Sequence, residues 1–289
     1  MDALKQPSLD TPSALKLVSG FFTQEWTGTD PREVHLKQIT GGFMNTLHLI
    51  RRQNEAATEP SAILIRHFGQ SGKVEEPPSS NLTLSAAQQA IVCWEMGRRG
   101  WGPKVYGFFD GGRLEEFIDS HTLTAAECAQ PDIRRDIARS YARLHSLHLP
   151  LRRDNYQLIV EELSEGIRSK SEDIVATLLA VNTPIARSYA AIFQAVNWLQ
   201  EFEWVSSLFT KHDCKTTLTQ GDTNHLNVLV RNSTSCCSKS NSRVLLIDYE
   251  TTTYSPRGFD LGGHFTERMY CHNQPGSRLT GARSSARRG

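Results

Sequence analysis

The sequence lacks most of the features that would assign it to a specialised class of protein. No apolar run approaches the roughly 18 residues of a membrane span, and no basic region followed by an apolar run marks a secretory signal. The six cysteines include no C-x-x-C pair, so reduced thiols in a cytoplasmic protein are the simplest interpretation. A net charge of +1 supplies no broadly basic surface, which argues against a nucleic-acid partner.

What is present is an ordinary globular composition, with 38% apolar and 22% charged residues among 289. That length can bury a sizeable core in one large domain or in two lobes. We expect a small β-rich lobe over residues 1–118, with an exposed polar loop at 70–81. Its predicted elements are strands at 34–40, 46–52 and 62–69, a helix over 82–100 and a hairpin over 104–118.

Helical periodicity dominates the chain after residue 118. It predicts two long amphipathic helices, at 132–148 and 185–209. Two strands, at 226–231 and 243–248, flank a polar segment that we expect to form an exposed hairpin tip. We therefore expect a mostly helical lobe over 119–270, followed by a disordered, arginine-rich tail at 271–289 that is too polar to fold by itself.

Chemistry is indicated most strongly by two segments, "LTQGDTNHLNVLV" (218–230) and "VLLIDYE" (244–250). In phosphoryl transfer, a loop Asp takes the proton of the acceptor hydroxyl and an Asn five residues later reaches a metal ion. A second Asp, after the next strand, holds the metal that bridges the phosphates. Asp222, Asn227 and Asp248 occur in that order and at that spacing. The alternative is that both aspartates are turn residues bordering a buried hairpin.

Two other segments permit phosphate chemistry without requiring it. The glycines of "ITGGFMNTL" could offer backbone N–H groups to phosphate oxygens, but a plain hairpin turn explains them equally well. Arg66 ends a β-rich run, where a kinase places a phosphate-pairing cation, but it could equally be a surface arginine. No G-x-x-x-x-G-K-[ST] motif occurs, so an NTPase of that kind is not expected.

The segment "RGFDLGGHFTE" (257–267) combines several polar groups with three glycines. We favour a structural role for Asp260, as a helix cap or as the residue that holds the loop around Asp222, over direct chemistry. His264 would share a helix face with Asp260, but no H-E-x-x-H motif or Cys partner supports a zinc pair. For His145 and His148 we expect packing or surface positions.

Taken in order along the chain, these segments resemble the choline/ethanolamine kinases, and "GRLEEFI" and "RGFD" are closer to the choline branch. The resemblance covers roughly residues 34–270 and also includes "ILIRHFG", "GWGPKVYGFF", "PDIRRDIARSYARLHSLHLPL" and "LIDYETTTYSPRGFDLGGHFTERMY". It implies an α+β, bilobed, protein-kinase-like fold, shared with aminoglycoside phosphotransferases. It also implies ATP-dependent phosphorylation of choline to phosphocholine, the first step of phosphatidylcholine synthesis.

The resemblance also implies a role for each matching residue. Asp222 would be the base that faces the choline hydroxyl, and Glu267 would lie in the choline pocket. Mg²⁺ would be bound by Asn227 and Asp248, with Glu250 nearby. ATP would be bound by residues of the small lobe and by the backbone of the interlobe hinge: Gly41, Gly42, Asn45, Arg66, Glu116, Phe117 and Ile118.

The sequence departs from the family pattern at four places. Gln220-Gly221-Asp222 replaces a usual His-Asn-Asp, and Thr251 stands where an aromatic residue is common. Gln89 replaces a glutamate that often pairs the phosphate-binding cation, which we expect to loosen Arg66. After Tyr270 the resemblance ends, so we expect a C-terminally truncated chain that exposes apolar surface.

These departures leave alternatives open. One is a catalytically impaired form that acts by pairing, as a homodimer or heterodimer, with a full-length kinase. Another is a kinase for ethanolamine or for an aminoglycoside-like alcohol.

Overall fold

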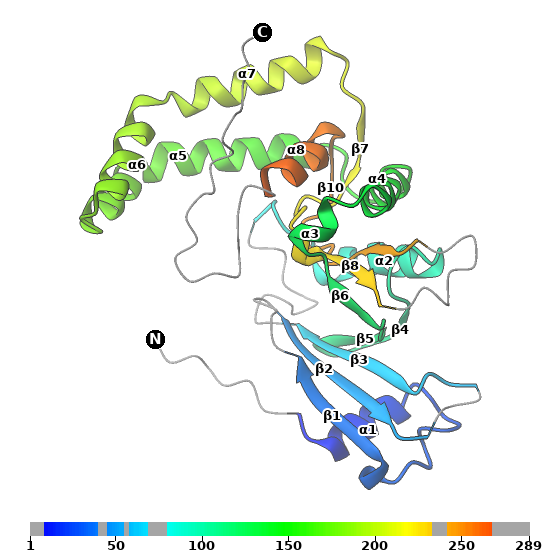
Figure 1. The fold of residues 1–289 in the computed structure, drawn as a ribbon. Coiled ribbons are helices and arrows are strands. Elements are labelled where there is room, and N and C mark those ends of the chain that lie inside the picture. Colours follow the sequence, from blue (N-terminus) through cyan, green and yellow to red (C-terminus); the bar gives the residue numbers. More distant parts are fainter. Residues whose placement is uncertain (1–8, 40–44, 55–57, 69–79, 233–241, 268–289) are drawn as a thin grey trace. The chain divides into compact units, whose positions relative to one another are not determined.

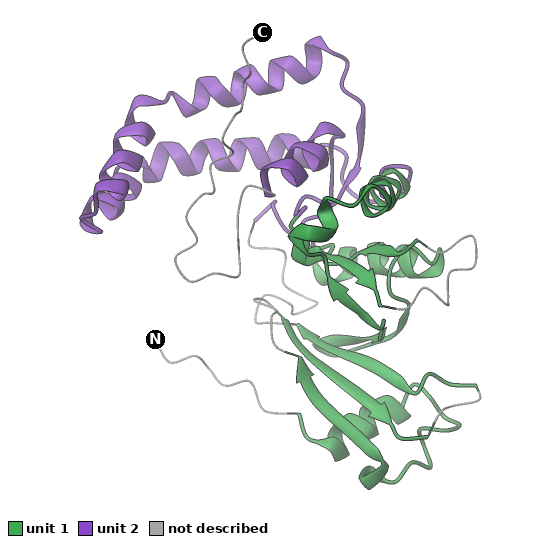
Figure 2. Cartoon of the chain, in the orientation of Figure 1, with its two compact units in different colours: residues 1–78, 85–143, 224–250 green, residues 79–84, 144–223, 251–289 purple. Residues whose placement is uncertain are grey.

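The computed structural model describes residues 9–39, 45–54, 58–68, 80–232 and 242–267. The chain forms two compact units that alternate along the sequence (Figure 2). Unit 1 comprises residues 1–78, 85–143 and 224–250, and unit 2 comprises residues 79–84, 144–223 and 251–289. The lobe boundary expected at residue 118 stays a prediction. The expected tail at 271–289, most of the 70–81 loop and most of the hairpin tip lie outside the described residues.

Unit 1 is built on a five-stranded antiparallel sheet of order β1-β2-β3-β5-β4 (Figure 1). Its strands match the strands and the hairpin predicted from the sequence: β1 (Val34–Ile39), β2 (Asn45–Arg52), β3 (Ala62–Phe68), β4 (Val105–Phe109) and β5 (Gly112–Glu116). Helix α1 (Thr11–Ser19), begun by an Asp10 N-cap, packs on one face of this sheet. Their shared core contains Val18, Trp26, Ile50, Ile63, Ile65 and Leu114.

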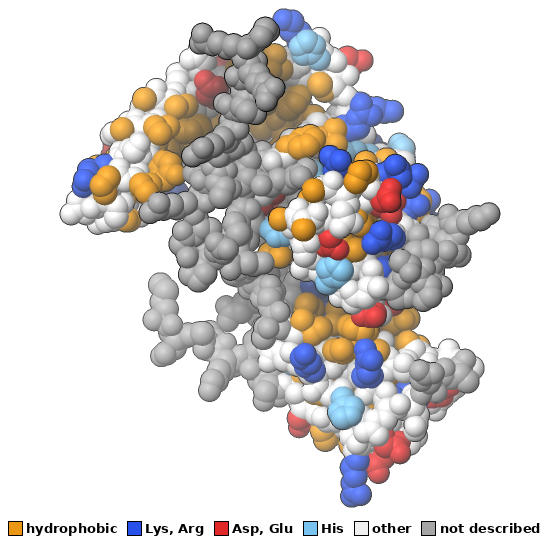
Figure 3. Space-filling view, in the orientation of Figure 1, with side chains coloured by type: hydrophobic (Ala, Val, Ile, Leu, Met, Phe, Trp, Pro, Cys, Tyr) orange, Lys and Arg blue, Asp and Glu red, His pale blue; other side chains and the backbone are white. Residues whose placement is uncertain are grey.

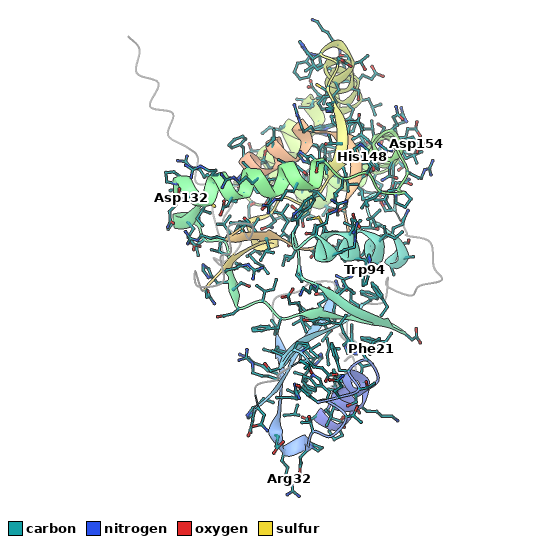
Figure 4. All side chains as sticks on the ribbon, turned by 90° about the vertical axis from the view of Figure 1, so that its right-hand side faces the viewer. Phe21, Arg32, Trp94, Asp132, His148 and Asp154 are labelled. Atoms are coloured by element: carbon teal, nitrogen blue, oxygen red, sulfur yellow. The ribbon has the colours of Figure 1, made fainter. Side chains whose placement is uncertain are left out.

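The rest of unit 1 contains helices and a second, smaller sheet. Helix α2 (Ala86–Arg98) begins at a Ser85 capping box and carries the exposed Trp94 (Figure 4). The small sheet has the order β6-β8-β9, from β6 (Ser120–Thr122), β8 (Val228–Arg231) and β9 (Val244–Leu246). Two more helices, α3 (Ala125–Cys128) and α4 (Pro131–His145), follow β6, and the 3₁₀ turn η1 (Pro31–Glu33) precedes β1.

Unit 2 is mostly helical, with a short antiparallel pair of strands, β7 (Thr216–Thr219) and β10 (Thr253–Pro256). Its helices are α5 (Asn155–Ala180), α6 (Pro184–Ala195), α7 (Trp198–Lys211) and α8 (Gly258–Glu267). Helix α5 contacts α6, α7 and β10. None of the helices within the described ranges is both long and apolar enough to cross a bilayer.

The single helix predicted at 185–209 is wrong, because α6 and α7 are separate helices. Val196 has an extended backbone with ψ of 129°, which ends α6. The Asn197 side chain then accepts a hydrogen bond from the backbone of Gln200 and caps α7. Apolar periodicity continues across this break, so only the capping asparagine marks it. The sequence reading also missed α1 and the long helix α5.

Apolar side chains of several helices of unit 2 reach the surface (Figure 3). The expectation that truncation exposes apolar surface stays a prediction. Most of the large apolar residues of unit 2 that are more than a third exposed lie on α5 to α8: Leu163, Leu179, Ile185, Tyr189, Ile192, Trp204, Phe259, Leu261 and Phe265. A surface of this kind favours association with another apolar surface.

Candidate active site

Asn227 and Asp248, the predicted metal ligands, lie at adjacent ends of the hairpin formed by β8 and β9 in unit 1. Asn227 ends the 3₁₀ turn η3 (His225–Asn227), directly before β8. The backbone N–H of Ile247 donates to the carbonyl of Asn227 at 2.9 Å, so Asp248 follows directly on the residue bonded to Asn227. The predicted strand-end arrangement of this pair is therefore present.

The backbone at Asp248 is in the left-handed region, with φ of 61°. Non-glycine residues seldom adopt this conformation, and such residues cluster at functional sites. The next residue, Tyr249, is buried and donates to the carbonyl of Leu246 at 2.6 Å, which secures the turn. The surrounding packing thus imposes the unusual backbone at Asp248.

The oxygen donors of Asn227 and Asp248 suit Mg²⁺, which prefers oxygen ligands and is usually held by one or two carboxylates plus substrate phosphates. Within the described part of the chain, no three His, Cys, Asp or Glu residues gather into a metal-binding group. A magnesium site built from the Asp248 carboxylate, the Asn227 amide and the phosphates of a nucleotide contains only one such residue, so it agrees with this finding. The residues therefore fit the ion that the resemblance implies.

Arg66 lies on β3 of unit 1 and is firmly held, contrary to the loosening expected from Gln89. Its Nε and Nη2 atoms donate to the two carboxylate oxygens of Glu115 at 3.1 and 3.4 Å. Arg113 also donates to Glu115 through Nε. All three residues are buried, so a glutamate of β5, in place of one on α2, anchors the predicted phosphate-binding cation.

The charge of Glu115 is maintained by these two arginines. Burial alone would raise the pKa of its carboxyl group, but the charges of Arg66 and Arg113 outweigh burial and lower the pKa to about 2. One small pocket of about 20 Å³ in unit 1 has Arg66, Cys93, Arg113, Glu115 and Asp248 among its lining residues. The predicted phosphate cation and the predicted metal ligand thus share a pocket.

The other residues predicted to bind the nucleotide lie at several places along unit 1. Gly41 and Gly42 lie outside the described residues, and Asn45 is the first residue of β2, paired with Phe68. Glu116 ends β5, and Phe117 and Ile118 form a linker between β5 and β6. The guanidinium of Arg51 lies 5.2 Å from the centre of the Phe117 ring. The nucleotide contacts of these residues stay predictions.

Asp222 belongs to unit 2, and the loop that carries it is anchored by Asp260 of α8. One carboxylate oxygen of Asp260 accepts from the Gln220 backbone N–H at 2.9 Å, and the other accepts from that of Gly221 at 3.0 Å. His145 Nε2 lies 2.8 Å from the first of these oxygens. Asp260 is fully buried. The favoured structural role of Asp260 is confirmed, and His145 proves to be part of the same support.

Two of the departures from the family pattern, Gly221 and Thr251, contact each other. Gly221 has φ of +84°, and a Cβ atom there would lie 2.4 Å from the carbonyl oxygen of Thr251. The Thr251 hydroxyl donates to the carbonyl of Gln220 at 2.9 Å. Only glycine fits this close approach without strain. The loop before Asp222 is therefore supported by Thr251 as well as by Asp260.

Helix α8 also contacts the other side of Asp222. A Cβ atom at Gly263 would lie 2.5 Å from the hydroxyl oxygen of Thr223, which is buried. Glu267 lies seven residues after Asp260, which places it on the same helix face, about 10 Å further along the axis. The predicted acceptor-binding residue is thus on the face of α8 that holds the Asp222 loop.

A Gly263→Ala substitution is expected to destabilise the protein by about 1–3 kcal/mol, because the added methyl group overpacks the contact with Thr223. The neighbouring Gly262→Ala is the matched control, since a Cβ atom there meets nothing within 4 Å. That control should be neutral or stabilising by up to about 1 kcal/mol through higher helix propensity. Urea unfolding measures both free energies. Equal effects of the two substitutions would contradict the close contact.

Sequence reasoning missed Arg113, Glu115 and His145 as parts of the site. The segment "GRLEEFI" is read as a hinge with a strand before it, and nothing local distinguishes its buried side chains from exposed ones. Leu114 points to the apolar core, so the pleat of β5 places Arg113 and Glu115 together on the other face. Their burial there comes from packing against other segments, which the sequence of the strand does not show.

The choline/ethanolamine kinase family matches residues 36–283, which extends past Tyr270, where we expected the resemblance to end. Choline kinase B1 of Caenorhabditis elegans is 28% identical over 252 residues, covering 86% of this chain and 61% of that protein. Mouse choline kinase alpha is 26% identical over 272 residues, covering 86% of this chain and 56% of that protein. The chain thus spans about three fifths of the length of these relatives.

The fold agrees with that assignment. The crystal structure of choline kinase from Cryptosporidium parvum superposes with a TM-score of 0.63, at 19% identity, covering 90% of this chain and 70% of that one. At this identity the likeness shows the fold, which is the protein-kinase-like fold predicted from the sequence. Because the family match covers most of its length, this chain belongs to the choline/ethanolamine kinase family.

Proposed function

We propose that this chain transfers the γ-phosphoryl group of ATP to the hydroxyl of choline, making phosphocholine. The observation that carries the proposal is the pocket of unit 1 in which Arg66 and Asp248 both lie, with Asn227 at the adjacent strand end. A cation for phosphate and oxygen ligands for a metal are the two requirements of a nucleotide site in a phosphotransferase. Family membership supplies the reaction class.

In this proposal, Arg66 binds the phosphates, and Asn227 and Asp248 bind the magnesium ion. Mg²⁺, when bound, neutralises charge that develops on the transferring phosphoryl group. The hinge backbone at residues 116–118 binds adenine, and Gly41, Gly42 and Asn45 approach the phosphates. Asp222 accepts the proton of the acceptor hydroxyl, and the hydrogen bonds of Asp260 to its loop support that role by limiting the motion of Asp222.

The acceptor is proposed to be a small amino alcohol with a cationic head group. Glu267 supplies a negative charge on the face of α8 that holds the Asp222 loop. A carboxylate attracts both the trimethylammonium group of choline and the primary ammonium of ethanolamine, and aromatic faces favour the former. We propose choline as the preferred acceptor and ethanolamine as the second candidate, which the family description includes.

The proposal is tested by measuring ADP release with Mg²⁺ and ATP in the presence of choline, of ethanolamine or of no acceptor. We expect choline-dependent turnover, with phosphocholine identified by mass spectrometry, and a slower rate with ethanolamine. ATP binding without acceptor-dependent turnover would contradict the proposal. In that case an impaired form that pairs with a longer kinase is favoured, and mixing the chain with such a kinase should change that kinase's rate.

A further inference from the structure

Arg113 is a buried cation of unit 1 that the proposed reaction does not use. It is 4% exposed, and its Nε donates to Glu115. Its Nη1 atom is buried and has no hydrogen-bond partner among the described residues. Leaving a charged donor unsatisfied in the interior costs more than the average hydrogen bond contributes. The group therefore needs a partner other than the described residues of the chain.

The register of the sheet places Arg113 directly opposite Arg66, the proposed phosphate cation, on the neighbouring strand. Like charges at directly opposite positions repel, and Glu115 offsets only one of the two charges. The pocket that both arginines line has room for about one oxygen atom, since about one water-sized sphere needs 10–15 Å³. An anionic oxygen in that space would satisfy both the surplus charge and the unbonded nitrogen.

The other groups of the pocket leave this charge available. Burial raises the pKa of the Cys93 thiol, so it stays neutral. Asp248 carries the remaining negative charge of the pocket, and under the proposed function that charge is used by the metal ion. With the ion in place, one positive charge of the arginine pair faces the ligand without compensation.

We propose that Arg113 is a second phosphate-binding cation, which donates through Nη1 to a phosphate oxygen of the nucleotide bound beside Arg66. This inference rests on the proposed function for the identity of the anion, a nucleoside phosphate. It adds a residue from β5, so that two neighbouring strands each supply one arginine to the phosphates.

The test measures the dissociation constants of adenosine, AMP, ADP and ATP, with Mg²⁺ present, for the wild-type chain and two variants. Arg113→Met keeps the length of the side chain but removes its charge. We expect it to weaken ATP binding about 10- to 100-fold and to leave adenosine binding unchanged, because one charge-assisted hydrogen bond is lost. The first member of the series to show the loss identifies the phosphate that Arg113 contacts.

Arg113→Lys separates a direct contact from an effect through Glu115. Lysine keeps a positive charge beside Glu115 but has no Nη1 atom, so we expect a smaller loss that is again confined to phosphate-bearing ligands. The variant also serves if the methionine variant does not fold. Wild-type ATP affinity in the lysine variant, or an equal loss for adenosine and ATP, would overturn the proposal.

Arg52→Met is the matched control. Arg52 is also a buried arginine of the same sheet, with an unbonded Nε, but it pairs with Glu25 and lies over Trp26, away from the pocket. Its substitution should leave the ratio of the dissociation constants for ATP and adenosine unchanged.

A wild-type chain that binds ATP but does not phosphorylate choline would contradict the proposed function and leave the Arg113 proposal standing. If the wild-type chain is active but the Arg113 variants keep its ratio of dissociation constants for ATP and adenosine, the Arg113 proposal is contradicted and the proposed function stands.

Discussion

An Asp222→Asn variant is expected to lose about 10²- to 10⁴-fold in kcat for phosphoryl transfer to choline, which is the usual contribution of a positioned general base. An amide has nearly the same shape as a carboxylate but cannot take up the hydroxyl proton. The loop should stay in place, because its anchors are the backbone bonds to Asp260 and the Thr223 contact with α8. Steady-state kinetics with choline and ATP measure the loss.

The pattern of kinetic constants distinguishes this role from metal binding. For Asp222→Asn we expect KM for ATP to stay within about threefold of the wild-type value, since the lost interaction belongs to the transition state. For Asp248→Asn we expect a higher Mg²⁺ concentration at half-maximal rate, because one carboxylate ligand is removed. Asp154→Asn is the control, since Asp154 is an exposed residue at the start of α5 (Figure 4). An Asp222→Asn variant that keeps more than about a tenth of kcat is inconsistent with a general base.

Glu115→Gln is expected to lower the free energy of unfolding by about 3–5 kcal/mol at neutral pH, the usual cost of removing one partner from a buried ion pair. The amide cannot compensate the guanidinium charges of Arg66 and Arg113, which stay buried. We also expect weaker ATP binding, because Arg66 loses its anchor. Urea unfolding and ATP titration measure the two effects.

The contribution of Glu115 to stability depends on pH in a defined direction. Its pKa is lowered from 4.5 to about 2 in the folded chain, so the unfolded state binds the proton more readily. The stabilisation is therefore fully present above pH 4.5 and is lost as the pH falls toward 2, and its size is on the order of 3 kcal/mol. The difference in unfolding free energy between wild type and Glu115→Gln should shrink over that window. A difference in unfolding free energy that stays constant between pH 4.5 and pH 2 would contradict the lowered pKa of Glu115.

Glu95→Gln is the matched control for this substitution. Glu95 of α2 also bridges two arginines, but the side chains of Arg98, the last residue of that helix, and Arg99, its C-cap, are 57% and 40% exposed. Exposed pairs of this kind contribute about 0–1 kcal/mol. We therefore expect a small effect at Glu95 and a large one at Glu115, and the comparison isolates the contribution of burial.

The features that could be predicted from the sequence are those set by residues close to one another along the chain. Segments 46–52 and 62–69 are short apolar-rich runs separated by a polar gap, and strands β2 and β3 form there. The break between α6 and α7 was missed because it depends on one capping residue, Asn197, within an uninterrupted apolar pattern. The position of Asn227 beside Asp248 was predictable because a hairpin joins the two residues within a short span of chain.

The sequence alone determined the family, the fold class and the order Asp222, Asn227, Asp248, because motif spacing and local periodicity are properties of the linear chain. Only the tertiary structure decided what holds these residues. Glu115 anchors Arg66 across 49 residues, and Asp260 holds the Asp222 loop across about 40. Such pairings depend on strand register and on burial, which are set when distant segments pack together. For the same reason Gly221, a departure from the family in sequence, became intelligible only through its contact with Thr251.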